Sequence, residues 1–79
     1  MTYHVYIIYS ELKHKYYIGQ TNDLVLRLAK HKSGLVKSTK HGIPWKLIWT
    51  TSVDSRSESM ILEKKIKNIG STRFLKKHL

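Results

Sequence analysis

Residues 3–21, YHVYIIYSELKHKYYIGQT, predict the pair of strands on which the rest of the fold is built. Residues 3–10 are rich in β-branched and aromatic side chains, which favour extended structure. Their almost continuous apolar character is typical of a strand that is buried on both faces. The polar residues 11–15 have the length of a hairpin loop, and residues 16–21 read as the returning strand. We therefore expect two antiparallel strands, with Gly19 near the end of the second, where a ligand or another backbone could approach closely.

A helix is predicted to follow this hairpin. Thr21 or Asn22 can cap its N-terminus, with Asp23 in the first turn facing the helix dipole. Gly34 is a typical C-terminal cap. The helix has one apolar side, and we expect four residues to form it: Leu24, Val25, Leu28 and Leu35.

Two polar residues of this helix, Arg27 and His31, are separated by one helical turn and therefore lie next to each other. They fall beside the apolar side rather than opposite it, which places them near the edge of the surface that the helix covers. The pair has two interpretations. It is either a solvated helix edge or part of a binding or catalytic site.

The second half of the chain predicts another strand. Residues 35–44 form a basic, irregular connection that ends in a turn at Gly42 and Pro44. Residues 45–53 alternate in polarity, as a strand with one buried face does.

A second helix should follow that strand. Ser55 and Glu58 match the capping box, in which each side chain bonds to a backbone N–H near the other residue. Gly70 ends the helix, and residues 71–79 form a short basic helix or turn. We expect the helix to bury Leu62, Ile66 and Ile69.

These elements follow the order β-β-α-β-α, with the short helix or turn at the C-terminus. We therefore expect an α/β fold of the α+β type, in which helices flank a three-stranded antiparallel sheet. A chain of 79 residues leaves room for one domain, residues 1–79.

The composition indicates a polyanionic partner. Fifteen Lys and Arg residues against five Asp and Glu give a formal charge of +10, and such a surface attracts nucleic acid by releasing its condensed counterions. A merely solvated surface or contact with anionic lipid are the alternatives. No basic amphipathic helix with bulky aromatic residues is present, so we expect no membrane partner.

The residue types also exclude some chemistry. The chain has no cysteine, which rules out thiol nucleophiles, disulfides and a thiolate zinc site. The N-terminus has no signal-peptide pattern and the apolar runs are short. We therefore expect a soluble, cytoplasmic protein.

The few carboxylates limit the chemistry further. Glu63 is the one acidic residue without a predicted loop or capping role, whereas the other four have one: Glu11, Asp23, Asp54 and Glu58. An ion pair with Lys67, worth about 0.3–0.5 kcal/mol, would be a purely structural use of Glu63. A two-metal phosphodiesterase site needs several carboxylates. A phosphodiesterase of this composition would therefore use one divalent ion, whose shell is completed by waters and phosphate.

Other residue types could supply the rest of such a site. Arginine matches two phosphate oxygens with its planar guanidinium, and a tyrosine or histidine can activate water. Composition alone does not favour this interpretation over tyrosines that simply pack in a sheet.

Ordered motifs along the whole chain resemble the GIY-YIG nuclease superfamily, in particular its small, stand-alone bacterial single-domain type. HVY (4–6) and YIG (17–19) stand where the family has its two name triplets, and the ten residues between Tyr6 and Tyr17 have the expected hairpin length. Three more segments resemble later parts of the family pattern: GQTNDLVLRLAKH (19–31), PWKLIW (44–49) and SRSESMILEKKIK (55–67).

This resemblance implies a DNA endonuclease that uses one Mg²⁺ or Mn²⁺ ion. Glu63 would hold the ion and Arg27 would brace the scissile phosphate. Tyr6 or Tyr17, helped by His31, would take a proton from the attacking water, and which of the three is the base stays open.

The resemblance also suggests where the substrate lies. Gly19 would keep the strand end clear so that a phosphate can approach. Further contacts are expected from the basic C-terminal tail and from the connection 35–44, through Lys37, Lys40 and His41. A homodimer would let each chain cut one strand of a duplex, although nothing in the sequence requires one.

The chain departs from the family pattern at two places. His4 replaces the first glycine of the name motif, and the position of an asparagine that some members use falls near Leu75. We expect an enzyme that acts on nicked, branched or damaged DNA, as in DNA repair, with little sequence specificity because phosphate contacts do not read bases. The alternatives are a catalytically silent nucleic-acid-binding module of the same fold and a protein-interaction domain.

Overall fold

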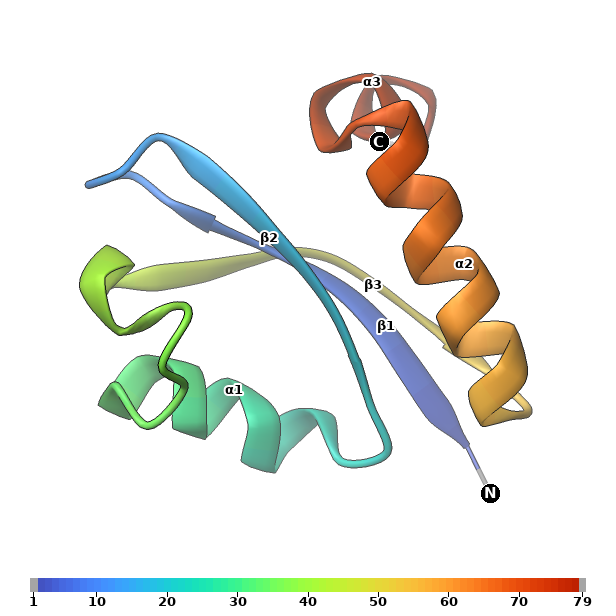
Figure 1. The fold of residues 1–79 in the computed structure, drawn as a ribbon, viewed down its shortest axis with the longest axis horizontal. Helices are drawn as coiled ribbons and strands as arrows, with labels where there is room; N and C mark the ends of the chain where they lie inside the picture. The colour runs from blue at the N-terminus through green and yellow to red at the C-terminus, as the bar shows by residue number, and fades with distance from the viewer. Residues whose placement is uncertain (1, 79) are drawn as a thin grey trace.

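Strand β1 (Tyr3–Ser10) is the middle strand of a three-stranded antiparallel sheet with the order β2-β1-β3 (Figure 1). The arrangement is that of a computed structural model of the protein, which describes residues 2–78. The edges are β2 (Lys15–Thr21), which begins one residue earlier than predicted, and β3 (Trp45–Val53). The central position of β1 explains its apolar sequence, because both of its faces are covered.

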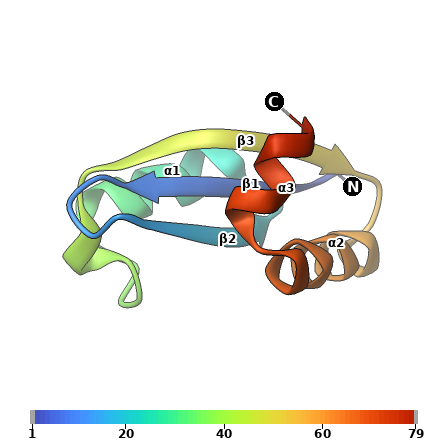
Figure 2. The same ribbon diagram turned by 90° about the horizontal axis from the view of Figure 1, so that it is seen from above.

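The helices are divided between the two faces of the sheet, as Figures 1 and 2 show. Helix α1 (Leu24–Ser33) and the short 3-10 helix η1 (Lys40–Gly42) cover one face. Helices α2 (Arg56–Ile69) and α3 (Ser71–His78) lie on the other. The predicted α+β class is therefore confirmed, and the predicted C-terminal helix or turn is a helix. Leu79, which the prediction included, lies outside the described residues.

Successive side chains of β1 point to opposite faces of the sheet, as strand geometry requires. Val5 and Ile7 point toward α2 and α3, whereas Tyr6 points toward α1. The main core therefore lies on the α2 side, where Ile48, Trp49 and Leu62 pack at the margin of one buried cluster: Val5, Ile7, Ile18, Ile66, Phe74 and Leu75.

The register of β1 and β2 brings the two motif tyrosines to the same face. Tyr6 lies opposite Gly19, and Ile8 lies opposite Tyr17. Because opposite residues of an antiparallel pair share a face, Tyr6, Gly19 and Tyr17 all face α1. This register places both motifs next to the helix that carries Arg27 and His31.

The N-terminus of α1 differs from the prediction. Asp23 is the N-cap residue, with extended backbone angles of φ −140° and ψ 91°, and its side chain accepts a hydrogen bond from the Leu26 N–H at 3.0 Å. The Thr21 hydroxyl instead accepts a bond from the Asp23 N–H at 3.1 Å. The prediction of Thr21 or Asn22 as the cap was wrong, because Asp23 remains extended and its carboxylate reaches the first turn.

The predicted apolar side of α1 was also wrong in part. Val25 is 81% exposed and Leu35 is 74% exposed, while Leu24 and Leu28 are half-buried. Gly34, with φ 81°, ends the helix as predicted and turns the chain before Leu35 can continue the helical face. The place expected for an apolar residue is taken by His31, which is 1% exposed.

Helix α2 begins as predicted. The Ser55 hydroxyl accepts a bond from the Glu58 N–H at 3.1 Å, and the Glu58 carboxylate accepts one from the Asp54 N–H at 3.3 Å. Ile66 is fully buried, but Ile69 is 41% exposed, contrary to the prediction. Ile69 is the last residue of the helix, and Phe74 and Leu75 of α3 cover the core instead. Within residues 2–78 no helix is both long enough and apolar enough to span a membrane.

Candidate active site at the edge of the sheet

Tyr6 is held in place by the strand pairing. Its side chain has no exposed surface, and its hydroxyl lies against the α carbon of Gly19, because a Cβ built on that glycine would overlap the phenol oxygen and Cζ of Tyr6. The glycine of the YIG triplet therefore makes room for the tyrosine of the first triplet. Whether Gly19 also leaves space for a phosphate stays a prediction.

Two side chains of α1 reach the Tyr6 hydroxyl. The Nε2 atom of His31 lies 2.8 Å from the phenol oxygen, and the Nε–H of Arg27 donates to it at 3.4 Å. Arg27 and His31 can meet one phenol because they occupy successive turns on the inner side of the helix. The predicted pair therefore belongs to a cluster, and His31 lies beneath the helix rather than at its edge.

Tyr17 completes the aromatic part of the cluster. Its ring lies 5.2 Å from that of His31, at an angle of 62°, and 6.5 Å from that of Tyr6. Unlike Tyr6, it is only partly buried. Tyr17 and Arg27 are thus the members of the cluster that a ligand can reach directly from solvent.

The surroundings shift the proton affinities of these groups. Burial raises the pKa of Tyr6 above its usual value, and the hydrogen bond from Arg27 opposes part of that rise. Burial, together with the positive charge of Arg27, lowers the pKa of His31 to about 4. The bond to Tyr6 raises the pKa of Arg27. At neutral pH the cluster therefore holds a neutral phenol and a neutral imidazole beside a permanent cation.

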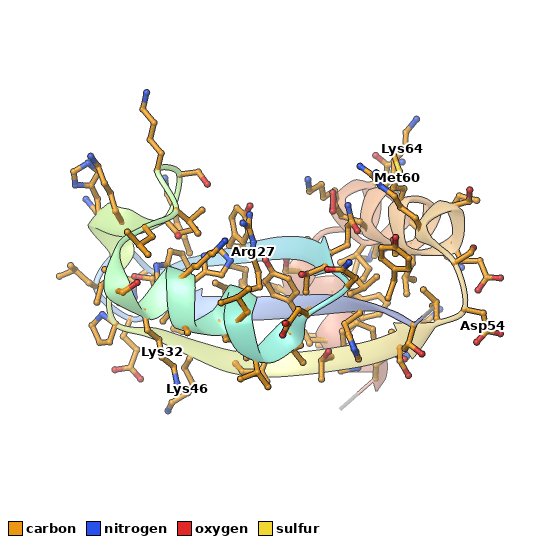
Figure 3. The ribbon with its side chains drawn as sticks, turned by 90° about the horizontal axis from the view of Figure 1, so that it is seen from below. Arg27, Lys32, Lys46, Asp54, Met60 and Lys64 are labelled. Atoms are coloured by element: carbon orange, nitrogen blue, oxygen red, sulfur yellow. The ribbon has the colours of Figure 1, made fainter. Side chains whose placement is uncertain are left out.

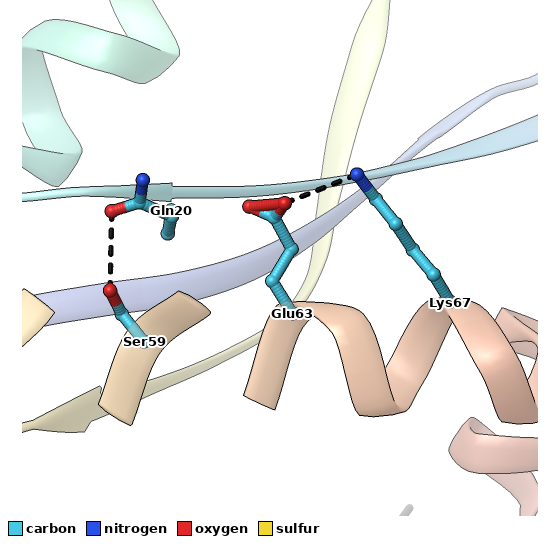
Figure 4. Close-up of polar contacts among 4 residues, drawn as sticks. All are labelled: Gln20, Ser59, Glu63 and Lys67. Carbon is cyan, nitrogen blue, oxygen red and sulfur yellow. Dashed lines mark hydrogen bonds and ion pairs between the residues drawn. The ribbon is translucent and has the colours of Figure 1, made fainter. Parts of the chain in front are cut away.

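Glu63 approaches the cluster from the other side of the sheet edge. It extends from α2 toward β2, in the same row of the helix as Ser59, whose hydroxyl donates to Gln20 at 3.2 Å (Figure 4). The Glu63 side chain is 24% exposed and pairs with Lys67 at 3.1 Å. Burial is the main cause of the raised pKa of Tyr6, and the negative charge of Glu63, on the opposite layer, makes the smallest of the contributions to it.

Arg27 and Glu63 therefore approach the edge strand β2 from opposite layers. Arg27 lies on the side of α1 that faces this edge, and α2 borders the same edge (Figure 3). Three of the predicted site residues lie elsewhere: Lys37, Lys40 and His41 are exposed on the connection after α1. The hydrogen bonds that join the cluster do not involve them, and their part in substrate binding stays a prediction.

A comparison of the whole chain with protein families agrees with this geometry. Residues 2–77 match the family model described as the GIY-YIG catalytic domain. The chain belongs to the GIY-YIG family. The membership that the motifs predicted is therefore confirmed.

This member of the GIY-YIG family is also similar to proteins named UPF0213. One from Halobacterium salinarum is 40% identical over 69 residues, which cover 86% of this chain and 88% of that protein. One from Streptococcus pneumoniae serotype 4 is 43% identical over 53 residues, 66% of this chain and 54% of that protein. The solution NMR structure of a UPF0213 protein from Bacillus halodurans superposes with a TM-score of 0.59 at 30% identity, covering 96% of this chain and 81% of that one.

The donor atoms at the GIY-YIG site fit one type of metal ion. In residues 2–78 no three His, Asp or Glu side chains come together as a closed metal site, and Glu63 is the carboxylate whose charge affects the pKa of Tyr6. Mg²⁺ commonly binds through one or two carboxylates and keeps waters and phosphate oxygens as its other ligands. A single partly exposed carboxylate suits that mode and does not suit a protein-only cage.

Two hollows lie on the surface that residues 2–78 form. One hollow of about 390 Å³ lies beside His31 and is lined by Leu28, Trp45 and neighbouring residues. Another, of about 960 Å³, lies between β3, α2 and α3. Neither is lined by Arg27 or Glu63. Arg27 and Glu63 are nevertheless both partly exposed, so a polymer backbone laid along the β2 edge could reach both residues.

Sequence reasoning missed one member of the cluster, Thr39. This residue is 1% exposed, and its hydroxyl lies 2.7 Å from the Nδ1 atom of His31. Thr39 stands in the irregular connection 35–44, where no periodic pattern marks a residue as buried or functional. Its position depends on the path of that connection, which the sequence did not predict.

Proposed function

We propose that this GIY-YIG protein is an endonuclease that hydrolyses DNA phosphodiester bonds with one divalent metal ion. The observation that carries the proposal is the hydrogen-bonded group of Tyr6, Arg27 and His31, together with Glu63 across the edge strand. A module that only bound DNA would gain nothing from a carboxylate here, because it repels phosphate unless a cation lies between them.

Glu63 is the residue that would hold the metal ion. Its carboxylate is partly exposed and already binds a cation, the ammonium of Lys67 at 3.1 Å. When bound, Mg²⁺ or Mn²⁺ supplies positive charge that stabilises the negative charge developing on the phosphate and leaving oxygen.

Arg27 and Tyr17 contact the substrate in this proposal, because both are partly exposed. The guanidinium of Arg27 binds the scissile phosphate, for which its planar fork is well suited. Its bond to Tyr6 is long, at 3.4 Å, and therefore weak enough to be exchanged for a phosphate oxygen. That exchange uncovers the Tyr6 hydroxyl, which has no exposed surface in the protein alone.

The Tyr6–His31 pair then accepts the proton of the attacking water. As the water oxygen bonds to phosphorus and the bond to the leaving oxygen breaks, the proton moves to the Tyr6 oxygen. The phenolic proton passes at the same time to Nε2 of His31, 2.8 Å away. Phosphate binding assists this transfer, because it offsets the charge of Arg27, which helps to keep the pKa of His31 low.

Little sequence specificity is expected of such an enzyme. A formal charge of +10 favours contacts with phosphates, and phosphate contacts position a duplex without reading its bases. A partly exposed site at the sheet edge suits nicked, branched or damaged DNA, in which a strand can leave the duplex axis. We therefore propose DNA repair or processing in the cytoplasm as the setting.

A catalytically silent DNA-binding module is the second candidate. It is favoured by the complete burial of Tyr6 and by the ion pair that already occupies Glu63. This candidate predicts binding without cleavage under all metal conditions.

One experiment separates the two candidates. The purified protein is incubated with supercoiled, nicked and branched DNA in the presence of Mg²⁺, Mn²⁺ or chelator. We expect cleavage that disappears with chelator and with Glu63→Gln, and that falls strongly with Arg27→Ala. Salt-sensitive DNA binding should persist in Glu63→Gln.

The matched control is Glu58→Gln, which removes the other carboxylate of α2. Glu58 bonds to the backbone before the helix, so its loss should lower stability slightly and leave cleavage intact. Equal cleavage by Glu63→Gln and the wild type would refute the proposed site. Binding without cleavage of any substrate would establish the silent module.

A further inference from the structure

A chain of hydrogen bonds runs from the site into the connection 35–44. The Tyr6 oxygen lies 2.8 Å from Nε2 of His31, and Nδ1 of the same ring lies 2.7 Å from the Thr39 hydroxyl. That hydroxyl in turn donates to the carbonyl oxygen of Val36 at 3.4 Å. The side chains of Tyr6, His31 and Thr39, which form this series of hydrogen bonds, are all buried.

The chain has a preferred direction of donation. The Tyr6 oxygen accepts the N–H of Arg27, so its own hydrogen is free to point at Nε2 of His31. Nε2 then acts as an acceptor, Nδ1 carries the ring hydrogen, and this hydrogen is donated to Thr39. The hydroxyl of Thr39 donates its own hydrogen to the Val36 carbonyl. All polar hydrogens are used, as buried polar groups require.

The opposite tautomer is less well satisfied. With its hydrogen on Nε2, His31 and Arg27 would both donate to the Tyr6 oxygen. The phenolic hydrogen would then have no acceptor among the contacts described for residues 2–78. A buried donor without a partner costs about 1–3 kcal/mol in general, so the tautomer with Nδ1–H is favoured.

Thr39 supports this choice because its hydroxyl hydrogen already points to the Val36 carbonyl, which leaves its oxygen to accept from Nδ1, and because its own position is fixed by the backbone. Its N–H donates to Val36 and its carbonyl accepts the Gly42 N–H, both at 3.0 Å. The indole N–H of Trp45 donates to the same carbonyl at 2.7 Å. The hydroxyl is therefore presented to His31 by a rigid segment.

We propose that Thr39 is a positioning residue, which holds His31 in the tautomer with hydrogen on Nδ1 so that Nε2 faces Tyr6 as a proton acceptor. The role in hydrolysis rests on the proposed function, whereas the tautomer does not. A Thr39 that only filled space in the connection would be replaceable by valine, which has nearly the same shape, without any effect on the histidine.

The first test is made on the protein alone by ¹⁵N NMR of the histidine rings, with His31 assigned from a His31→Gln spectrum. We expect the wild type and Thr39→Ser to show hydrogen on Nδ1 and an unprotonated Nε2. Thr39→Val should show a mixture of tautomers or reversed tautomers. Hydrogen on Nε2 in the wild type, or an unchanged Nδ1–H in Thr39→Val, would overturn the proposal.

The second test uses DNA cleavage. Thr39→Val should lower kcat by about tenfold, part of the roughly 10²–10⁴-fold that a general base contributes, with little change in KM and an altered pH profile. Thr39→Ser should restore kcat. If neither the wild type nor any variant cleaves DNA, the proposed function fails. The NMR result still decides whether Thr39 holds the tautomer of His31. If Thr39→Val fails to fold, Thr39→Ala, which also lacks the hydroxyl, is read in the same way.

Discussion

The hydroxyl of Tyr6 lies in the space that a side chain at Gly19 would fill. The two residues are directly opposite each other in β1 and β2, and a Cβ at position 19 would overlap the phenol. The two motifs of the family are thus complementary within one chain, since the glycine of one accommodates the tyrosine of the other. The same contact directs the phenol oxygen toward His31.

Substitution of this glycine should therefore damage both stability and site. Gly19→Ala is expected to lower the free energy of unfolding by about 1–3 kcal/mol, as overpacking of a core does, in urea denaturation followed by circular dichroism. The same alanine should cost much less in a Tyr6→Leu background, because the obstructing ring is absent. An equal cost in both backgrounds would show that Tyr6 is not the obstacle.

The lowered pKa of His31 predicts a loss of stability in acid. Unfolded His31 titrates near 6.5 and folded His31 near 4, so between these values the unfolded chain binds a proton that the folded chain refuses. The stabilisation is complete above pH 6.5 and is lost as the pH falls to 4. The expected loss is on the order of 3 kcal/mol, measured by urea denaturation across this range.

His31→Gln is the control for this pH dependence. Tyr6, Tyr17 and Arg27 face the ring, and the charged residues Glu11, Lys32 and Lys46 line the adjacent hollow. The variant keeps all of these groups and removes only the imidazole. Its stability should therefore be lower at pH 7 and nearly flat between pH 6.5 and 4. An equally steep curve would assign the effect to other groups.

The proposed substrate path predicts unequal effects of two charge reversals. Lys37→Glu with Lys40→Glu should weaken DNA binding strongly and lower the slope of log affinity against log salt by about 0.9 for each phosphate that the variant no longer neutralises. Both residues are exposed on the connection that carries Thr39. Fluorescence anisotropy with a labelled duplex over a salt series measures both quantities.

Lys76→Glu with Lys77→Glu is the matched comparison, because it makes the same change in charge on α3. These lysines line the hollow between β3, α2 and α3, away from the β2 edge. A smaller decrease in affinity is expected for this pair. A larger decrease would place the duplex mainly over α3, the basic tail that the sequence also predicted to contact DNA, and would leave Lys37 and Lys40 a minor part in binding.

The elements that the sequence predicted well are those with local signals. The apolar run of β1, the glycine after α1 and the serine before α2 each depend on a few neighbouring residues, and their predictions were confirmed. Whole-chain family motifs also led to Tyr6, Tyr17, Arg27 and His31, which the structure brings together. Their catalytic roles stay predictions.

The errors came from contacts between distant segments. His31 reads as polar, yet it is buried because Tyr6 and Thr39 satisfy both of its nitrogens. Leucine and valine at positions 35 and 25 read as core residues, but the sheet offers them no surface to cover. Thr39 could not be found at all, since its role arises only when the connection 35–44 folds back beneath α1.

The ion pair of Glu63 and Lys67 leads to the final prediction. The ammonium of Lys67 lies 3.1 Å from the carboxylate that is proposed to hold the metal, so lysine and metal compete for it. Lys67→Met should therefore lower the Mg²⁺ concentration that gives half-maximal cleavage. The pair is partly exposed, and such pairs contribute at most about 1 kcal/mol, so the expected decrease is a few-fold.

Lys64→Met separates this competition from a general reduction of positive charge. Lys64 is exposed on the same helix and is not the partner of Glu63, so its replacement should leave the Mg²⁺ midpoint unchanged. DNA affinity measured in chelator should fall by similar amounts in both variants, because each has one cation fewer. If Lys67→Met instead raises the Mg²⁺ midpoint, Lys67 assists the metal site and does not compete with the ion. Glu63 would then bind the ion while it remains paired with Lys67.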